Sequence, residues 1–502
     1  MKQYEVPEPI LNSPYHEPSE YWRIVEGELP RKIKGRRPAR YYYRPPVKVM
    51  GEAPEGIGTE IELKIVNRIR ERLKEWLPLA LKGQGGVSGV TFEILKYWHR
   101  EGRAQNRLFF AQLEAAEAII FLNEARVDFL QGITIPLDEP SEDHKAEGFR
   151  AFRRYAAKMA TGTGKTTVMG MIIAWSILNK LNNRNDGRFS DAVLVICPNV
   201  TIRSRLQELY PDRGEGSIYR TRDLVPPHLM PELMKGKVFI SNWHIFEPQI
   251  MQTGGVSARV AKTGVPVRTV ESITISDKTT TARGIRYLTP HDLARQVDAG
   301  ILSIIDEDRD RQGHLRKVRV ESVKYVESDT ALLNRVLGRE IGSKQNILVI
   351  NDEAHHAYRI RRSEPEEYEE DLFGEEEEVE EFFKEATVWI EGLDHVHKYR
   401  GINFCVDLSA TPYFLGRMGP DSNRIFPWVV SEFGLTDAIE SGLTKIPQLA
   451  VRDTTGKEIP GYFNIWRWIL PHLTSSEKGG RKESPKPEAI LKWANTPIVM
   501  LA

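Results

Sequence analysis

Short, almost wholly apolar segments recur along this chain of 502 residues, and they constrain its fold more than any other feature. They lie at Ala192–Cys197, Val238–Ile240, Ile347–Ile350 and Phe404–Leu408. Continuous runs rich in β-branched residues are typical of strands buried on both faces, as in a parallel sheet covered by helices. Segments with helical spacing of apolar residues separate these runs, so the sequence predicts an α/β fold.

A glycine-rich motif, MATGTGKT at Met159–Thr166, lies between a predicted strand at Phe152–Lys158 and a predicted helix at Thr166–Leu181. Its glycines allow a tight turn that aims backbone N–H groups at phosphate oxygens, and the following helix N-terminus adds positive potential. The Lys165 ammonium is predicted to reach the β- and γ-phosphates, and the Thr166 hydroxyl to bind Mg²⁺. Methionine begins the motif where the strict pattern has glycine, and a turn without a ligand is the alternative. The residues predicted to bind nucleotide are Thr161, Gly162, Thr163, Gly164, Lys165, Thr166 and Thr167.

An acidic box, NDEAHH at residues 351–356, follows the apolar run that ends at Ile350. A carboxylate at the carboxyl end of a parallel strand lies in the crevice where such sheets bind ligands. Asp352 is therefore predicted to hold Mg²⁺, and Glu353 to orient and deprotonate the attacking water. With Lys165 they make the predicted catalytic set. An acidic turn that caps a helix is the alternative, and His356 is given no role.

The sequence DLSATP at residues 407–412 also follows an apolar run directly. Alone, a Ser/Thr turn closed by proline would explain it. The order is more informative, because three polar motifs each follow a predicted buried strand. The span from Lys165 to Asp352 is long for one nucleotide-binding core, so we interpret residues 251 to 344, which include predicted hairpins at Val267–Thr281, as an insertion.

Together the three motifs resemble motifs I, II and III of superfamily 2 DEAD/DEAH-box helicases. Four segments are more specifically similar to the N-terminal half of the Res subunits of type III restriction endonucleases: Val193–Leu209, Asn351–Tyr358, Asp407–Phe414 and Gly434–Val451. The resemblance implies a RecA-like P-loop NTPase lobe at residues 101–450, with the insertion before the DEAH box. Residues 1–100 would be a basic, aromatic and proline-rich N-terminal extension, and residues 451–502 a linker and the stub of a missing second lobe.

The resemblance also implies roles for residues outside the three motifs. Gln112 matches a glutamine that reads adenine, and a solvated helix glutamine is the alternative. Thr201, Arg203 and Arg205 match a motif that grips the nucleic-acid backbone, although ordinary surface arginines would look the same. Ser241–His244 resembles a further gripping motif more weakly.

Coupling between ATP and nucleic acid is implied for three residues. Ser409 and Thr411 would link the two sites, with His355 as their relay. The resemblance implies ATP and Mg²⁺ as cofactors and double-stranded DNA as partner, with ATP hydrolysed to ADP and phosphate during translocation.

Two features of the family are not found in the sequence. No pattern matches the arginines of the second lobe, and none matches the C-terminal nuclease domain. We therefore expect this chain alone to bind nucleotide and to hydrolyse it slowly. Its partners would include a second-lobe or nuclease polypeptide and a methyltransferase (Mod-type) subunit. An RNA- or repair-related helicase and a non-catalytic nucleic-acid-binding remnant remain alternatives.

The formal net charge of zero hides two blocks of opposite sign. Residues 31–48 carry eight basic and no acidic side chains, together with Tyr41, Tyr42 and Tyr43. This block would bind nucleic acid by phosphate neutralisation and stacking, or it would lie on its own domain. Residues 364–385 carry thirteen acids and one lysine. We interpret them as a solvated acidic loop or a fraying helix, because like charges repel along a helix.

The apolar segments and the cysteine content indicate the cellular compartment. The sequence has no apolar stretch long enough to cross a bilayer and no signal-peptide core near Met1. Its two cysteines, Cys197 and Cys405, are too few for a disulfide framework or a zinc site. We expect a cytoplasmic protein with no membrane partner.

Overall fold

The computed structural model describes most of the chain up to residue 445. The described residues are 8–25, 28–43, 59–103, 105–248, 264–276, 280–282, 285–298, 302–309, 315–338, 341–359, 375–414 and 423–445, with a few isolated positions. The chain divides into two compact units, Met1–Thr444 and Lys445–Ala502. Only isolated residues of the second unit are described, so the elements below belong to the first.

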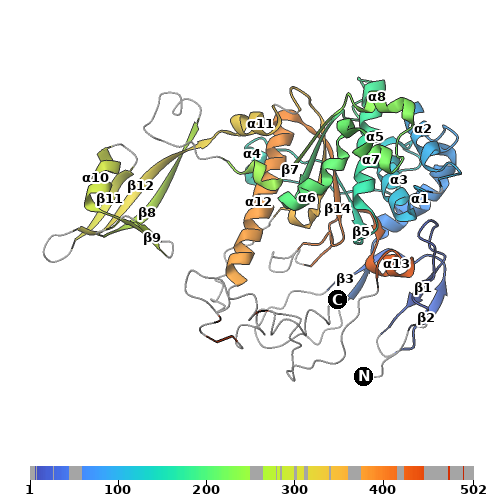
Figure 1. Ribbon diagram of the computed structural model, residues 1–502, viewed down its shortest axis with the longest axis horizontal. Coiled ribbons are helices and arrows are strands. Elements are labelled where there is room, and N and C mark those ends of the chain that lie inside the picture. Colours follow the sequence, from blue (N-terminus) through green and yellow to red (C-terminus); the bar gives the residue numbers. More distant parts are fainter. Residues whose placement is uncertain are drawn as a thin grey trace. The chain divides into compact units, whose positions relative to one another are not determined.

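Six parallel strands form the central sheet in the order β15-β5-β14-β13-β6-β7 (Figure 1). Their bounds are β5 Arg154–Met159, β6 Ala192–Cys197, β7 Lys237–Asn242, β13 Ile347–Asp352, β14 Ile402–Ser409 and β15 Val429–Phe433. The predicted α/β class is confirmed, and the sheet is that of a RecA-like P-loop lobe. The predicted strands are all present. Strand β15 was not predicted, because VVSEF is short and contains serine and glutamate.

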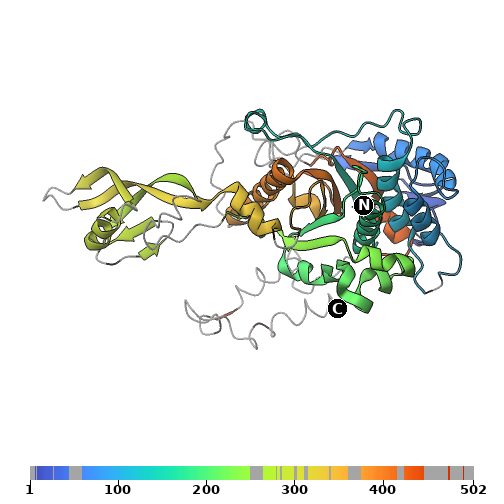
Figure 2. The same ribbon diagram turned by 90° about the horizontal axis from the view of Figure 1, so that it is seen from above.

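Helices cover both faces of this sheet, which explains its apolar strands. In β6, Val193 and Val195 pack into the core on one face, whereas Leu194 and Ile196 pack into the core on the other. Helices α1, α3 and α5 lie on the first side and α12 on the second (Figures 1 and 2). The main helices are α1 Lys64–Ala80, α2 Gly89–Trp98, α3 Phe110–Glu124, α5 Lys165–Asn182, α11 Asp329–Leu337 and α12 Glu375–Arg400.

Shorter elements connect the layers. The short helices are α4 Glu142–Ala146, α6 Val200–Arg205, α7 Ile218–Thr221, α8 Met230–Leu233 and α13 Leu435–Glu440. The 3₁₀ turns are η1 Leu206–Leu209, η2 Pro211–Gly216, η3 Pro227–Leu229, η4 Trp243–Phe246 and η5 Ala354–His356. Within the described residues, no helix is both long and apolar enough to cross a membrane.

The N-terminal extension is structured and differs from expectation at one helix. Strands β1 (Glu20–Arg23) and β2 (Arg31–Lys34) pair antiparallel, as do β3 (Arg40–Tyr43) and β4 (Thr59–Glu62). The spacing of apolar residues predicts a helix from Glu60 to Leu77 that Pro78 would end, but α1 begins at Lys64 and continues through Pro78. Proline at this position removes one backbone hydrogen bond of the last turns, a loss that the packing of α1 offsets.

The insertion forms a second sheet between β7 and β13 in the sequence. Its five strands have the order β11-β12-β8-β10-β9. Their bounds, with the helix of this segment, are β8 Gly264–Ile275, β9 Thr280–Ala282, β10 Ile285–Leu288, α10 Pro290–Asp298, β11 Leu302–Arg309 and β12 Leu315–Glu327. Ile273, Leu293 and Val318 belong to a separate apolar cluster, so this sheet has a core of its own. Strand β8 pairs with distant β12 instead of forming the expected local hairpin.

The acidic segment is helical where the structure describes it. From Glu375 onward its residues lie in α12, so the loop interpretation is wrong for 375–385, and residues 360–374 lie outside the described residues. Tertiary packing offsets the repulsion between glutamates, because Trp389 and Leu393 of the same helix are fully buried. Lys384 also forms an ion pair with Glu247 at 2.6 Å.

Candidate nucleotide-binding site

The phosphate loop connects β5 to α5 at the carboxyl edge of the central sheet. Gly162 and Gly164 have φ angles of 88° and 90°, which L side chains rarely adopt. The buried Thr163 hydroxyl donates to the Ala160 carbonyl at 2.7 Å and closes the turn. Met159 is a fully buried core residue at the end of β5, which accounts for its place in the motif. The loop therefore has the glycine-dependent turn that anion binding requires.

The acidic box begins at the end of β13, two strands away from β5. Asp352 is the last residue of that strand, and Glu353 follows with a φ of 49°. The Lys165 ammonium contacts the Glu353 carboxylate, with 2.5 Å between Nζ and Oε1. Two motifs that are 188 residues apart in the sequence thus meet at one point of the sheet edge.

Asp352 has the environment of a cation ligand. Its side chain is 7% exposed, and burial, followed by the neighbouring Glu353 charge, raises its pKa to about 6, while Lys165 lowers it. A bound cation would favour the charged form that burial disfavours. Thr166 is half-buried in the first turn of α5. Mg²⁺ is commonly held by one or two protein oxygens together with substrate phosphates, so these residues fit that ion.

Across the described part of the chain, no group of three or more histidine, cysteine or acidic side chains could hold a metal ion. Cys197 and Cys405 are both buried and free, and burial raises the pKa of each thiol.

The serine–threonine motif lies beside the acidic box. His355 Nδ1 is 2.9 Å from the Ser409 hydroxyl and 3.5 Å from Glu353 Oε2. The Thr411 backbone N–H donates to the same hydroxyl at 3.0 Å. Burial and the adjacent His356 lower the pKa of His355 to about 4, so its imidazole is neutral at pH 7. The predicted relay residues are in contact, and their coupling role stays a prediction.

Sequence reasoning missed a buried polar network beneath these motifs. The Arg154 guanidinium donates to Asp407 Oδ2 at 2.8 Å, to Asp138 Oδ2 at 2.9 Å and to the Ala357 carbonyl at 2.6 Å. Asn351 donates to the other Asp407 oxygen at 2.8 Å. Burial alone would lower the pKa of Arg154, but Asp407 and Asp138 raise it well above its usual range. The network ties β5, β13 and β14 together. The arginine and aspartate within apolar strands were the signal that could have revealed it.

Gln112 lies against the phosphate loop. It is 6% exposed, which excludes a solvated helix glutamine. Its side-chain oxygen accepts from the Phe109 N–H at 3.0 Å, and a Cβ on Gly164 would lie only 2.1 Å from its Nε2. Its position beside the loop is therefore established, and adenine recognition stays a prediction.

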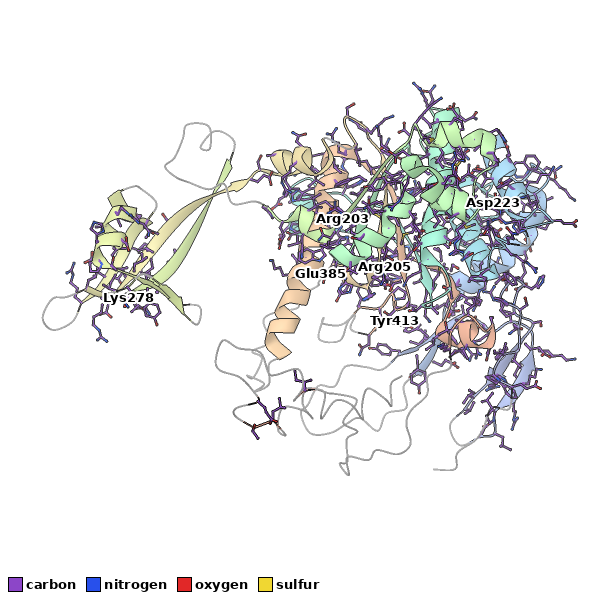
Figure 3. All side chains as sticks on the ribbon, viewed as in Figure 1. Arg203, Arg205, Asp223, Lys278, Glu385 and Tyr413 are labelled. Carbon is purple, nitrogen blue, oxygen red and sulfur yellow. The ribbon has the colours of Figure 1, made fainter. Side chains whose placement is uncertain are left out.

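The residues predicted to grip nucleic acid lie on α6, directly after β6. Thr201, Arg203 and Arg205 are all exposed, and Figure 3 shows the two arginines on this helix. They remain candidates for phosphate contact. In the weaker motif, Ser241 and Trp243 are buried and belong to the packing of the sheet edge.

The described part of the basic block pairs with acidic side chains of the same chain. Arg36 Nη2 donates to Glu114 Oε2 at 2.6 Å, and Arg37 Nη2 donates to Glu440 Oε1 at 2.5 Å. Lys32 pairs with Glu20 at 2.8 Å. Of the two interpretations, the structure supports an arm that lies on its own domain. Residues 44–48 lie outside the described residues.

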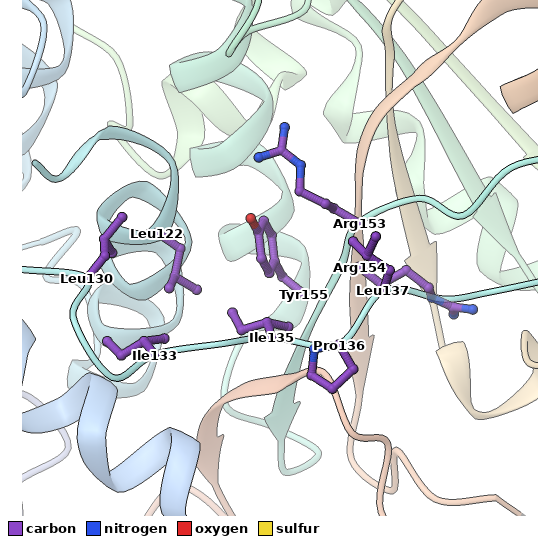
Figure 4. A pocket seen from close by; sticks show the side chains of 9 residues that line it. All are labelled: Leu122, Leu130, Ile133, Ile135, Pro136, Leu137, Arg153, Arg154 and Tyr155. Atoms are coloured by element: carbon purple, nitrogen blue, oxygen red, sulfur yellow. The ribbon is translucent and has the colours of Figure 1, made fainter. Parts of the chain in front are cut away.

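A cavity lies near the opposite, amino end of β5 (Figure 4). Its volume is about 170 Å³. It is lined by Leu122, Leu130, Ile133, Ile135, Pro136, Leu137, Arg153, Arg154 and Tyr155. This cavity is distinct from the nucleotide site, because its walls are mostly apolar and it lies at the other end of β5 from the phosphate loop.

One comparison with known proteins gives a match, and the matched segment includes the phosphate loop. Neither a curated protein nor a solved structure matches the chain. A family model described as "Type III restriction enzyme, res subunit" matches residues 105–250, which include α3, the phosphate loop and α6. This segment is therefore a superfamily 2 helicase-like domain of the kind found in the res subunits of type III restriction enzymes.

Proposed function

We propose that this chain binds Mg·ATP at the carboxyl edge of its central sheet and serves as the ATP-binding lobe of a type III restriction-type DNA translocase. The contact between Lys165 and Glu353 carries the proposal, because it joins the phosphate loop to the acidic box. The family match of residues 105–250 supports an ATP-dependent, helicase-like activity in general.

The residues of the phosphate loop and the acidic box have different roles in this proposal. Backbone N–H groups of the loop bind phosphate oxygens, and Lys165 exchanges its Glu353 partner for the β- and γ-phosphates. Glu353, once released, accepts a proton from the attacking water. Asp352 and Thr166 would hold Mg²⁺, which supplies neutralisation of the phosphate charge when bound.

Efficient hydrolysis needs a further group in this proposal. An arginine from a second RecA-like lobe would stabilise the transition-state charge, and such residues contribute on the order of 10³–10⁵ to turnover in related systems. We therefore propose slow hydrolysis by residues 1–502 alone. Double-stranded DNA, a second-lobe or nuclease polypeptide and a Mod-type methyltransferase are the proposed partners.

Nucleotide binding is the first test. Isothermal titration of the full chain with Mg·ATP should give one binding site, and Lys165→Ala should remove it. Lys180→Ala is the matched control, because Lys180 lies at the far end of α5 and donates to the Asp186 carbonyl at 2.9 Å. Failure of the wild-type chain to bind, or equal binding by Lys165→Ala, would refute the proposal.

The nucleic-acid substrate needs a separate experiment. Duplex DNA, but not RNA, should stimulate ATP hydrolysis when a second lobe is supplied. Stimulation by RNA alone would favour an RNA helicase, and no stimulation by either would favour a binding remnant. Each of these results contradicts the restriction-type assignment.

A further inference from the structure

The turn that ends the first compact unit lies against the phosphate loop. The Thr444 hydroxyl donates a hydrogen bond to the Thr161 carbonyl at 2.8 Å. A Cβ placed on Gly162 would lie 3.1 Å from the Leu443 carbonyl oxygen and 3.6 Å from the Thr444 hydroxyl. Leu443 and Thr444 therefore contact the loop at Thr161 and Gly162, and this close approach is a second reason for glycine at residue 162.

Helix α13 sets the position of this turn. The N–H groups of Leu443 and Thr444 both point to the Ala438 carbonyl, at 2.8 Å and 3.3 Å. Gly442, with a φ of 68°, reverses the chain between the helix and the turn. A displacement of α13 would therefore move Thr444 relative to the phosphate loop.

The N-terminal segment holds the last residue of α13, Glu440. The Glu440 backbone carbonyl accepts the N–H groups of Leu11 at 2.8 Å and Asn12 at 2.9 Å. Its side-chain Oε1 accepts from the Trp22 N–H at 3.0 Å and from Arg37 Nη2 at 2.5 Å. Glu440 is 3% exposed, so these hydrogen bonds form in a low-dielectric environment that strengthens them.

The N-terminal segment makes further contacts with α13 and with the turn that follows it. Arg37 also pairs with Asp437 at 3.3 Å and donates to the Trp22 carbonyl at 3.1 Å. A Cβ on Gly442 would lie 3.6 Å from the Ile10 side chain. We name residues 10–25 and 28–37 the N-terminal clasp. The clasp contacts Glu440 of α13, and the turn that follows α13 contacts Thr161 of the phosphate loop. These contacts connect the basic block to the phosphate loop.

We infer that Thr444 and Glu440 are positioning residues for the phosphate loop and that the N-terminal clasp holds them in place. The inference rests on the proposed function, since it takes the loop to bind Mg·ATP. A loop held at Thr161 and Gly162 presents its N–H groups in a fixed arrangement, so binding requires less ordering. Coupling is reciprocal: nucleotide that favours the seated turn also stabilises the clasp.

The first experiment compares two substitutions of Thr444 in the full chain. Thr444→Val removes the hydroxyl with little change of shape, and Thr444→Ser retains it. Calorimetry with Mg·ATP should show about threefold to tenfold weaker binding for Thr444→Val, the range expected for one lost hydrogen bond. Thr444→Ser should bind like the wild type. A merely structural residue would not give this difference at unchanged thermal stability.

The second experiment measures amide hydrogen exchange in the clasp. The N–H groups of Leu11 and Asn12 should exchange more slowly when Mg·ATP is added to the wild type. Met234 is an internal reference, because its N–H donates to the Met230 carbonyl at 3.1 Å, outside both the clasp and α13. The protection by Mg·ATP should be lost in Thr444→Val.

The outcomes separate this inference from the proposed function. Equal Mg·ATP affinity for Thr444→Val and the wild type, with binding still abolished by Lys165→Ala, would overturn only the inference. Unchanged exchange of Leu11 and Asn12 on adding Mg·ATP would overturn the role of the clasp. A wild-type chain that does not bind Mg·ATP would overturn the proposed function and this inference with it.

Discussion

Two ion pairs, one within the central sheet and one at its edge, each join a basic side chain to a carboxylate in different surroundings. Arg154 and Asp407 have no exposed side-chain area, and the guanidinium has three acceptors. Lys165 and Glu353 are 13% and 27% exposed. Breaking a buried, fully satisfied pair leaves an uncompensated charge, whereas a partly exposed pair exchanges its partner at little cost. The first pair therefore holds strands together, and the second is available to a ligand.

The largest expected effect is on the buried pair. Arg154→Met should lower the free energy of unfolding by roughly 3–5 kcal/mol, because Asp407 and Asp138 would be left buried without their partner. Urea unfolding followed by circular dichroism measures this change. Arg40→Gln is the matched control, since Arg40 pairs with the exposed Glu60 at 2.5 Å and should change stability little. Equal stabilities for both variants would contradict the comparison.

A smaller effect is expected from pH at the ligand-binding edge. The pKa of Asp352 is raised to about 6, so its carboxyl group loses its proton as the pH rises through that value. Because Mg²⁺ needs the charged form, Mg·ATP affinity should rise about tenfold between pH 5 and pH 7. Titrations at several pH values measure the rise. Asp352→Asn should bind Mg·ATP weakly at every pH, so its affinity should vary little with pH. If this variant kept the pH dependence of the wild type, Asp352 would not be a ligand of the metal ion.

The smallest expected effect concerns α6. Arg203→Gln should leave Mg·ATP binding and stability unchanged, because the side chain is exposed. It should weaken duplex DNA binding and reduce the salt dependence by about one counterion. Fluorescence anisotropy at several salt concentrations measures both quantities. An unchanged salt slope would show that Arg203 is an ordinary surface residue.

Local sequence patterns predicted the sheet and the motifs at its edge. Strands such as Ala192–Cys197 are apolar throughout because both of their faces are covered, and this leaves a direct mark on the sequence. The placement of Lys165 and Glu353 at one edge of the sheet was also predictable, since parallel strands bring their carboxyl ends to one edge. The ion pair between them was not predicted. The order of apolar runs and polar motifs along the chain was sufficient to predict both the sheet and the edge at which the motifs lie.

Contacts between distant charged residues could not be predicted in the same way. Arg37 and Glu440 are 403 residues apart, and Arg154 and Asp407 are 253 apart. Periodicity and propensity describe neighbours along the chain and carry no information on such pairings. The basic block therefore had two interpretations from sequence, and the buried partners of Arg36 and Arg37 favour an arm that lies on its own domain. Pro78 is a further case, because α1 continues through this proline although proline locally favours the end of a helix. The packing that outweighs this local preference could not be predicted from neighbouring residues.

We propose that the partly exposed pair of Lys165 and Glu353 binds a ligand and contributes little to the stability of the fold. One pair of measurements on Lys165→Ala tests it: calorimetric titration with Mg·ATP and urea unfolding of the same sample. We expect Mg·ATP binding to be lost while the free energy of unfolding stays within about 1 kcal/mol of the wild type. Retained binding, or unfolding as severe as that of Arg154→Met, would contradict it.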